Sequence, residues 1–262
     1  SLASDSGILA GMETLLNCTD CRRLAGFVCS FLIGVLTMTS LSCSALSNLG
    51  GKSIDQTFTD EKIVALVKAA DAGDATKVAL LVRQGANVNA VGNNGATPLI
   101  WALNARNHRG VEALLQAGAD PNLVTDKVGM SPMNFVPMGD DPELLRLLLK
   151  HGGNPNHPGQ GKVDERPLSQ AASEGRIENL KLLLEAGADI NAHDKFNESA
   201  ATLSLALGKF EATAFLLDHG FNFNLPYLAR RVKIVQVPDN SDAQRWKDKV
   251  LLMLEEKVLG AK

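Results

Sequence analysis

The residues that could hold a metal ion or form a disulfide are concentrated at one end of the chain. All four cysteines lie within the first 43 residues, at Cys18, Cys21, Cys29 and Cys43. Cys18 and Cys21 have the CxxC spacing of a zinc site, but no second cysteine pair and no histidine cluster follows to complete four ligands. We therefore expect no metal site, and no disulfide in the sequence beyond Cys43.

Side chains that could support catalysis do not form a familiar arrangement. The sequence contains no GxSxG turn, no HExxH, no glycine-rich phosphate loop ending in Lys-Ser/Thr and no calcium loop. The five histidines are spread along the chain. His151 and His219 share an offset before a glycine, which suits a helix C-terminus, and Asp140, Asp141 and Glu143 suit a helix start. We expect a protein that is not an enzyme and uses no cofactor.

Composition and charge narrow the class of protein further. The chain has 262 residues, of which 45% are hydrophobic and 21% charged, enough apolar material for a folded domain. The formal net charge is −3, whereas a nucleic-acid-binding domain requires a basic face. We expect a folded domain that does not bind nucleic acid.

The first 44 residues have the order of an export signal. Arg22 and Arg23 precede the apolar run of residues 24–38, and small residues follow. The run is shorter than the roughly 20 residues of a membrane span. We predict a leader and signal over residues 1–44, with Met12 as an alternative start, and a mature protein in the periplasm or lipid-anchored in the bacterial envelope.

Two alternatives exist for the end of this signal. Residues 40–43, with the sequence SLSC, resemble the site at which bacterial lipoproteins are cut and lipidated on the new terminal cysteine, here Cys43. Ordinary cleavage near Ala45 is the other alternative. The Ser- and Gly-rich residues 45–58 suit a flexible linker. Membrane contact is expected only through a lipid on Cys43.

A phrase of leucines, a glycine and an asparagine recurs through the rest of the chain. Residues 182–192 read LLLEAGADINA, and the glycines that close each phrase are separated by 33, 34, 35 and 33 residues: Gly85, Gly118, Gly152, Gly187 and Gly220. The leucines predict the buried stripe of a helix, the glycine its left-handed end, and the Asn/Asp pair a turn. Pro98, Pro132 and Pro167 suit the first turn of a preceding helix.

These repeats resemble a known family. GATPLIWAL at residues 95–103, GMSPMNFVP at 129–137 and DERPLSQAA at 164–172 resemble the GxTPLHxAA pattern of ankyrin repeats, and the leucine–glycine phrase resembles their LLLxxGADxN. The resemblance covers about residues 59–224. It implies an all-α solenoid of five stacked helix–turn–helix units joined by β-hairpin-like loops. We predict a helical cap over residues 225–262, with helices at 227–235 and 241–258 and Trp246 in the core.

The repeats depart from the family pattern at two kinds of position. The histidine of the pattern is replaced by Ile100, Asn134, Ser169 and Thr202, so its hydrogen bonds must be lost or replaced. Pro137 falls inside the first helix of the third repeat, which should therefore be short or kinked. We expect Met133 and Phe135 to take core positions of that helix.

The resemblance implies that hairpin tips and the exposed side of the first helices bind a partner protein. The residues at those offsets are Asn93, Asn94, Asn104, Lys127, Met130, Met138, Lys162, Glu165, Lys195, Phe196 and Glu198. Phe196 is the strongest candidate for an anchor, because an aromatic side chain at a hairpin tip suits a binding hot spot. The alternative is that Phe196 packs against the neighbouring hairpin.

Together with the export signal, the repeats resemble those of exported bacterial ankyrin proteins, some of which neutralise secreted toxins, including lipases. The leading expectation is a monomeric, non-catalytic protein-binding module of the envelope, acting as an immunity protein or as an adaptor. The alternatives are a secreted effector that binds host proteins and an accessory to a periplasmic oxidative-defence enzyme. The sequence does not identify the partner.

Overall fold

The computed structural model describes residues 53–125, 129–159 and 165–260, all within one of the two units of the chain, Gly51–Lys262. The predicted leader of residues 1–44, with Cys43, and the site candidates Lys127 and Lys162 lie outside these described residues. Within the described ranges, no helix combines the length and apolar composition of a membrane span.

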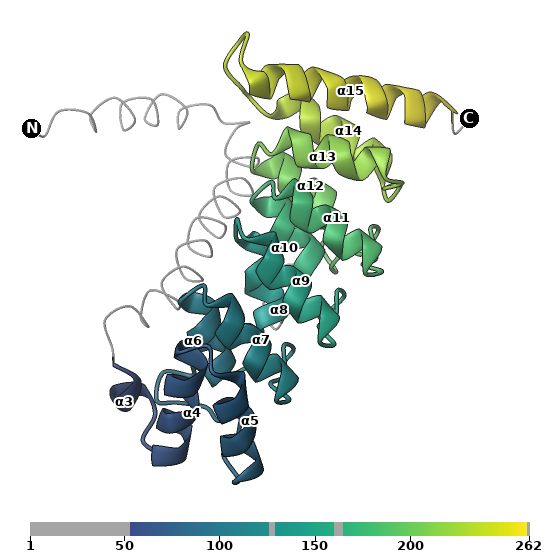
Figure 1. The fold of residues 1–262 in the computed structure, drawn as a ribbon. Coiled ribbons are helices and arrows are strands. Elements are labelled where there is room, and N and C mark those ends of the chain that lie inside the picture. Colours follow the sequence, from purple (N-terminus) through teal and green to yellow (C-terminus); the bar gives the residue numbers. More distant parts are fainter. Residues whose placement is uncertain (1–52, 126–128, 160–164, 261–262) are drawn as a thin grey trace, which may run out of the picture. The chain divides into compact units, whose positions relative to one another are not determined.

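Five helix pairs follow one another along the chain, and each pair packs against the next (Figure 1). The pairs are α4 (Glu61–Asp71) with α5 (Ala75–Arg83), α6 (Pro98–Asn104) with α7 (His108–Gln116), α8 (Pro132–Phe135) and the 3-10 turn η1 (Val136–Met138) with α9 (Pro142–Lys150), α10 (Pro167–Ser173) with α11 (Ile177–Glu185), and α12 (Ala200–Ala206) with α13 (Phe210–Asp218). The predicted all-α solenoid is confirmed.

The ends of these helices follow from the residues identified in the sequence. Thr97 begins α6 by accepting a hydrogen bond from the Ile100 N–H at 3.2 Å, with Pro98 in the first turn. Each second helix ends at a glycine with positive φ, for example Gly118 at 95° and Gly187 at 88°. A side chain at that φ would be strained, so glycine fixes the exit of the chain into the hairpin.

Asparagines link each repeat to the next. As predicted, the first residue of the Asn/Asp pair holds its own turn in the first four repeats; for example, the Asp120 carboxylate accepts from the Asn122 N–H at 2.8 Å. The second residue reaches further. Asn122 Nδ2 donates to the Gly152 carbonyl at 2.9 Å, and its Oδ1 accepts from the Asn154 N–H at 2.8 Å. Asn89 and Asn156 repeat this bridge, which the sequence did not predict.

Pro137 shortens the first helix of the third repeat, as predicted. Regular α-helix stops after the four residues of α8, and η1 follows. The carbonyls freed there are met by the fourth repeat: Asn179 Nδ2 donates to the Pro137 and Gly139 carbonyls at 2.8 and 3.0 Å, and Arg176 Nε donates to the Met138 carbonyl at 2.9 Å. The break is therefore stabilised by its neighbour.

One replacement of the expected histidine also forms links to a neighbouring segment. Asn134 Nδ2 donates to the His157 carbonyl at 3.2 Å and to the Glu165 carbonyl at 3.0 Å, which ties α8 to the following hairpin. Its Oδ1 accepts from the N–H and hydroxyl of Ser131. Met133 beside it is buried, as predicted for a core position.

Helices α14 (Leu225–Ile234) and α15 (Asp242–Gly260) form the predicted C-terminal cap, close to the predicted bounds. Helix α15 packs against α13 and α14, and its Val250 and Leu254 are fully buried. Trp246 is only half-buried. Its indole packs against the core on one side and lies under Lys249, whose Nζ is 4.7 Å from the ring centroid.

At the other end, the fold begins earlier than expected. The predicted linker ran to residue 58, whereas α3 (Ile54–Thr57) is a helical turn capped by Ser53. Phe58 is buried and packs edge-on against Trp101, with 6.3 Å between ring centroids. A phenylalanine buried at the end of the stack explains why residues 53–58 belong to the folded unit.

Candidate protein-interaction surface

Phe196 stands at the tip of a hairpin whose shape is fixed by hydrogen bonds. We call residues 193–199 the Phe196 hairpin. Asp194 Oδ1 accepts from the N–H groups of Phe196 at 2.7 Å and Glu198 at 2.9 Å, and the Asp194 N–H donates to the Glu198 carbonyl at 2.9 Å. The Phe196 side chain is 60% exposed, with Lys195 Nζ 5.1 Å from its ring centroid. The tip therefore presents an aromatic ring to solvent.

A second set of residues lies on the exposed side of the first helices. Each member is six residues ahead of the N-cap of its second helix, and we call the set the first-helix row: Lys68, Trp101, Phe135, Gln170 and Leu203. Lys68 is exposed and the other four are half-buried. The middle of the row thus offers two aromatic rings that the fold covers only in part.

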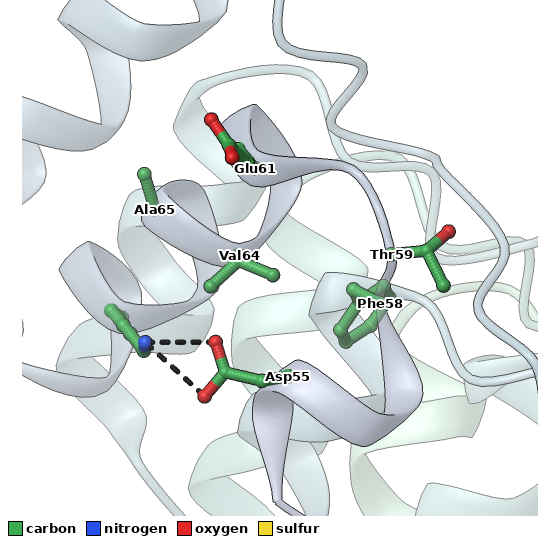
Figure 2. Close-up of a pocket in the computed structure, with 7 residues that line it drawn as sticks. Asp55, Phe58, Thr59, Glu61, Val64 and Ala65 are labelled. Carbon is green, nitrogen blue, oxygen red and sulfur yellow. Dashed lines mark hydrogen bonds and ion pairs between the residues drawn. The ribbon is translucent and has the colours of Figure 1, made fainter.

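The row meets a shallow depression at the α3 end of the stack, shown in Figure 2. Its volume is about 470 Å³, and its lining is Asp55, Phe58, Thr59, Glu61, Val64, Ala65 and Lys68. The Asp55 carboxylate is turned toward the Lys68 ammonium group at 3.0 Å. Phe58, which lines the depression, packs edge-on against Trp101 of the row.

The predicted contact residues of the first hairpins have mixed surroundings. Asn93 is exposed, but its N–H donates to the Thr57 carbonyl at 2.9 Å and its Nδ2 to the Gln56 carbonyl at 3.3 Å, so it holds α3 in place. Asn94 is half-buried, and Asn104 is exposed at the end of α6.

Three further predicted contact residues are only partly accessible. Met130, Met138 and Glu165 are half-buried around the third repeat. Phe135, predicted as core, is half-buried and belongs to the first-helix row. The Phe135 side chain thus packs against the core and is also partly exposed to solvent.

Glu198 does not lie on the surface, contrary to the prediction from its offset. Its side chain is 8% exposed, and this burial raises the pKa of its carboxyl group. Glu198 directly precedes the α12 N-cap Ser199, and the equivalent residue of the second repeat, Ala96, is fully buried. The position faces inward, which the offset alone did not reveal.

Asp140 and Asp141, near the α9 start, contact basic side chains of the second repeat. Asp141 is the N-cap residue of α9, yet its carboxylate lies 2.9 Å from His108 Nε2, and Asp140 lies 2.6 Å from Arg106. Both pairs connect the second and third repeats. His151 and His219 sit at helix C-caps, as predicted. Over the described ranges, no group of three or more potential ligands could hold a metal ion.

Sequence reasoning missed four members of the first-helix row, namely Lys68, Trp101, Gln170 and Leu203. The signal was present in the sequence as a constant offset of six residues before each second-helix cap. Only the structure shows that this offset is half-exposed in four successive repeats.

Comparison with known proteins agrees with this architecture. The family model described as Ankyrin repeats (3 copies) matches residues 41–125 and 118–194. Protein PhlB of Serratia liquefaciens is 30% identical over 188 residues, covering 72% of this chain and 81% of PhlB.

Two further relatives match shorter segments. A putative ankyrin repeat-containing protein of Treponema pallidum is 36% identical over 98 residues, covering 37% of this chain and 33% of that protein. Rat cyclin-dependent kinase 4 inhibitor B is 34% identical over 106 residues, covering 40% of this chain and 79% of the inhibitor. This chain thus covers a third of the Treponema protein's length. With five stacked helix pairs and these matches, the chain belongs to the ankyrin-repeat family, whose repeats serve as protein–protein interaction modules.

Proposed function

We propose that this protein is a non-catalytic module of the bacterial envelope that binds a partner protein on the Phe196 hairpin and the first-helix row. The observation that carries the proposal is the exposure of the Phe196 ring on a hairpin in which one aspartate carboxylate accepts two backbone hydrogen bonds. An anchor that is fixed before binding loses little conformational entropy when the complex forms.

The half-buried rings of Trp101 and Phe135 extend this surface. Aromatic side chains contribute large contact areas at interfaces, and their partial coverage by the fold limits their freedom in the unbound protein. The three rings give a partner apolar anchors on two elements, a hairpin tip and a row of short helices. The partner itself is a folded protein or a segment with complementary apolar side chains.

The proposed role is to neutralise a secreted lipase-type toxin or to act as an envelope adaptor. Export is supported by the signal-like order of residues 1–44. The similarity to a named kinase inhibitor shows that repeats of this kind occur in a protein named for inhibiting an enzyme. In the proposed role, this protein blocks a toxin by occupying its surface, without chemistry of its own.

An affinity capture from periplasmic extract, followed by mass spectrometry, tests the binding proposal. The wild-type protein should retain a defined partner, and Phe196→Ala should lose it. Leu80→Ala, at an exposed leucine on the second helix α5, is the matched control and should retain the partner. A partner set that survives the combined Phe196→Ala and Trp101→Ala changes would refute this surface.

Cell fractionation tests the envelope location. The protein should appear in the periplasm or membrane fraction, and labelled fatty acid should be incorporated unless Cys43 is changed to alanine. A periplasmic protein without label would select cleavage near Ala45. Recovery of the protein in culture supernatant would instead favour the secreted effector, and peroxide sensitivity after gene loss would favour the oxidative-defence accessory.

A further inference from the structure

No hairpin follows the Phe196 hairpin within residues 165–260, because the chain passes from Asn224 directly into α14. Near the other end of the stack, by contrast, the following loop bonds to the hairpin before it: the Thr125 hydroxyl donates to the Gly95 carbonyl at 2.7 Å. Asn197 takes the place of Gly95 in the Phe196 hairpin, since each has a positive φ and donates its N–H to the carbonyl of the third residue before it. Asn197 is exposed. The Phe196 hairpin therefore has one side without a neighbouring hairpin.

Helix α14 begins beside the base of this hairpin. The His193 ring stacks on the Phe223 ring, with 3.8 Å between centroids and 10° between planes. Asn191 Oδ1 accepts from the Phe223 N–H at 3.1 Å, and α14 starts shortly afterwards. By chain geometry, the Phe196 Cα lies at most about 11 Å from that of His193, and Arg230 lies about 8 Å along the axis from the start of α14. The hairpin tip and the middle of α14 are therefore within reach of one short segment of a partner.

One face of α14 is exposed and combines basic with apolar side chains. Leu228 and Val232 are fully buried, so the opposite face of the helix is in solvent. Arg230 and Ile234 are exposed there. Ile234 at 66% and Phe196 at 60% are the most exposed large apolar side chains of the described residues. Two apolar side chains that the fold leaves in water thus lie on neighbouring elements.

The charges that reach solvent on the Phe196 hairpin and α14 are positive. Lys195, Arg230 and Lys233 are exposed and form no ion pair within the parts of the chain that the structure describes. Both carboxylates of the hairpin are turned inward: Asp194 bonds two backbone N–H groups through Oδ1 and has Oδ2 buried, and Glu198 is buried. Helix α14 contains no acidic residue. This part of the surface is therefore basic, although the formal net charge of the chain is −3.

We propose that an acidic segment of the partner protein docks on the open side of the Phe196 hairpin and on the exposed face of α14. Its carboxylates pair with Lys195, Arg230 and Lys233, and its apolar side chains cover Phe196 and Ile234. This inference rests on the proposed function and adds to it the chemical class of the partner's contact segment. It also extends the surface from the repeats to the C-terminal cap.

The arrangement of these side chains favours a protein segment over a lipid surface. Each exposed apolar side chain has a lysine next to it in the chain, Lys195 before Phe196 and Lys233 before Ile234. This pairing matches a segment in which acidic and apolar side chains occur together over a short distance. Arg230 can bind a carboxylate through two parallel hydrogen bonds. Three unpaired cations are fewer than the roughly four to eight Lys or Arg of a site for anionic lipid.

A library of random peptides displayed on phage and selected on the full chain tests this chemistry. The recovered peptides should be enriched in Asp and Glu that flank an aromatic or aliphatic residue. One recovered peptide is then synthesised with a fluorescent label and serves as the probe in anisotropy titrations. Its affinity for the wild-type protein should fall as the salt concentration rises, because exposed charges are screened.

Two double variants and one single variant separate charge from apolar contact. Arg230→Gln combined with Lys233→Gln should weaken peptide binding about tenfold and flatten its salt dependence, because two charges are removed. Lys77→Gln combined with Lys181→Gln removes two exposed charges from the second helices α5 and α11 and should leave binding unchanged. Phe196→Ala should weaken binding and keep its salt dependence. Urea unfolding should show wild-type stability for both double variants.

Recovered peptides that are neutral or basic would overturn the inference, as would a selection that recovers none. Equal effects of the two double variants would also overturn it. Binding of anionic lipid vesicles that is lost with Arg230 and Lys233, without any binding of acidic peptides, would assign the surface to a membrane instead. Binding that depends on Phe196 but not on Arg230 and Lys233 would refute the acidic segment alone and leave the proposed function standing.

Discussion

At the scale of single residues, the Phe196 hairpin contains two side chains, Phe196 and Glu198, whose exposure is unusual for their type. Two positions apart, one side chain is 60% exposed and apolar, and the other is 8% exposed and acidic. Each arrangement is unfavourable for stability in isolation, because apolar surface stays in water and a carboxyl group is buried. Local conflicts of this kind are expected at functional sites and are offset by favourable interactions elsewhere in the fold.

Replacing Glu198 by glutamine should stabilise the protein at pH 7, by about 1 kcal/mol, because a neutral amide is cheaper to bury than a carboxylate. Folding raises the pKa of Glu198, so the folded state binds the proton more tightly than the unfolded state. The free energy of unfolding of the wild type should therefore rise relative to that of the variant as the pH falls from above the raised pKa toward 4.5. Thermal unfolding at several pH values measures this. A stability difference between the two proteins that stays constant from pH 8 down to pH 4.5 would contradict the assignment.

Removing the Phe196 ring should affect binding and leave stability almost unchanged. For Phe196→Ala we expect a loss of about 2 kcal/mol in partner affinity, as for an interface hot spot. The free energy of unfolding should change by less than about 0.5 kcal/mol, as at other exposed positions. Calorimetric titration and urea unfolding give the two values. A large loss of stability would mean that the ring packs within the fold.

At the scale of elements, each hairpin is held by the asparagine of the preceding repeat. Asn122 both donates to and accepts from the backbone that opens the next hairpin, so one side chain fixes the distance and register of two units. The second and third repeats are joined as well by the ion pair of Arg106 with Asp140 and by the contact of His108 Nε2 with the Asp141 carboxylate. Exposed ion pairs contribute little to stability.

Asn122→Ala should therefore lower the free energy of unfolding by about 1–2 kcal/mol, because two backbone groups lose their partner. Asn224 occupies the same place in the fifth repeat but is followed directly by α14, with a φ of 44° that glycine adopts freely. Asn224→Gly is the matched control, and we expect it to change stability by less than about 0.5 kcal/mol. Equal losses for the two variants in urea unfolding would show that the bridge has no special role.

At the scale of the whole folded unit, stability comes from interfaces between neighbours. A helix pair buries its apolar face only against the next pair, so the last pair needs a cover. Helices α14 and α15 supply it with fully buried side chains of Leu228, Val232, Val250 and Leu254. At the opposite end, α3 and Phe58 play the corresponding part on α4.

Leu254→Ala should destabilise the protein by about 2–5 kcal/mol, since it empties a fully buried site under the cap. Leu252 lies two residues earlier on the same helix and is 58% exposed. Leu252→Ala should thus change stability by less than about 0.5 kcal/mol. Thermal unfolding of the two variants compares a buried position with an exposed position of the same helix. Similar effects of both changes would contradict the packing of α15 on the stack.

The number and order of the repeats could be predicted because leucine stripes, glycine stops and proline starts are local patterns. Pro137 likewise predicted its own helix break. The bridges of Asn122, the rescue of the freed carbonyls by Asn179 and the burial of Glu198 depend on residues of other repeats or of the cap. Offsets within one repeat cannot show such contacts. For the same reason, the sequence could not distinguish the buried position of Glu198 from the exposed position of Phe196.

The amide bridges run in one direction, since each unit reaches forward and is held from behind. A unit that is duplicated in tandem at such a junction brings its own asparagine. Its backbone can also form hydrogen bonds with the asparagine of the previous unit. The third unit is different, because its broken helix relies on Arg176 and Asn179 of its successor. If this array is lengthened by duplication, the third unit should therefore be copied together with the fourth. Otherwise the duplicated unit should be one of the others.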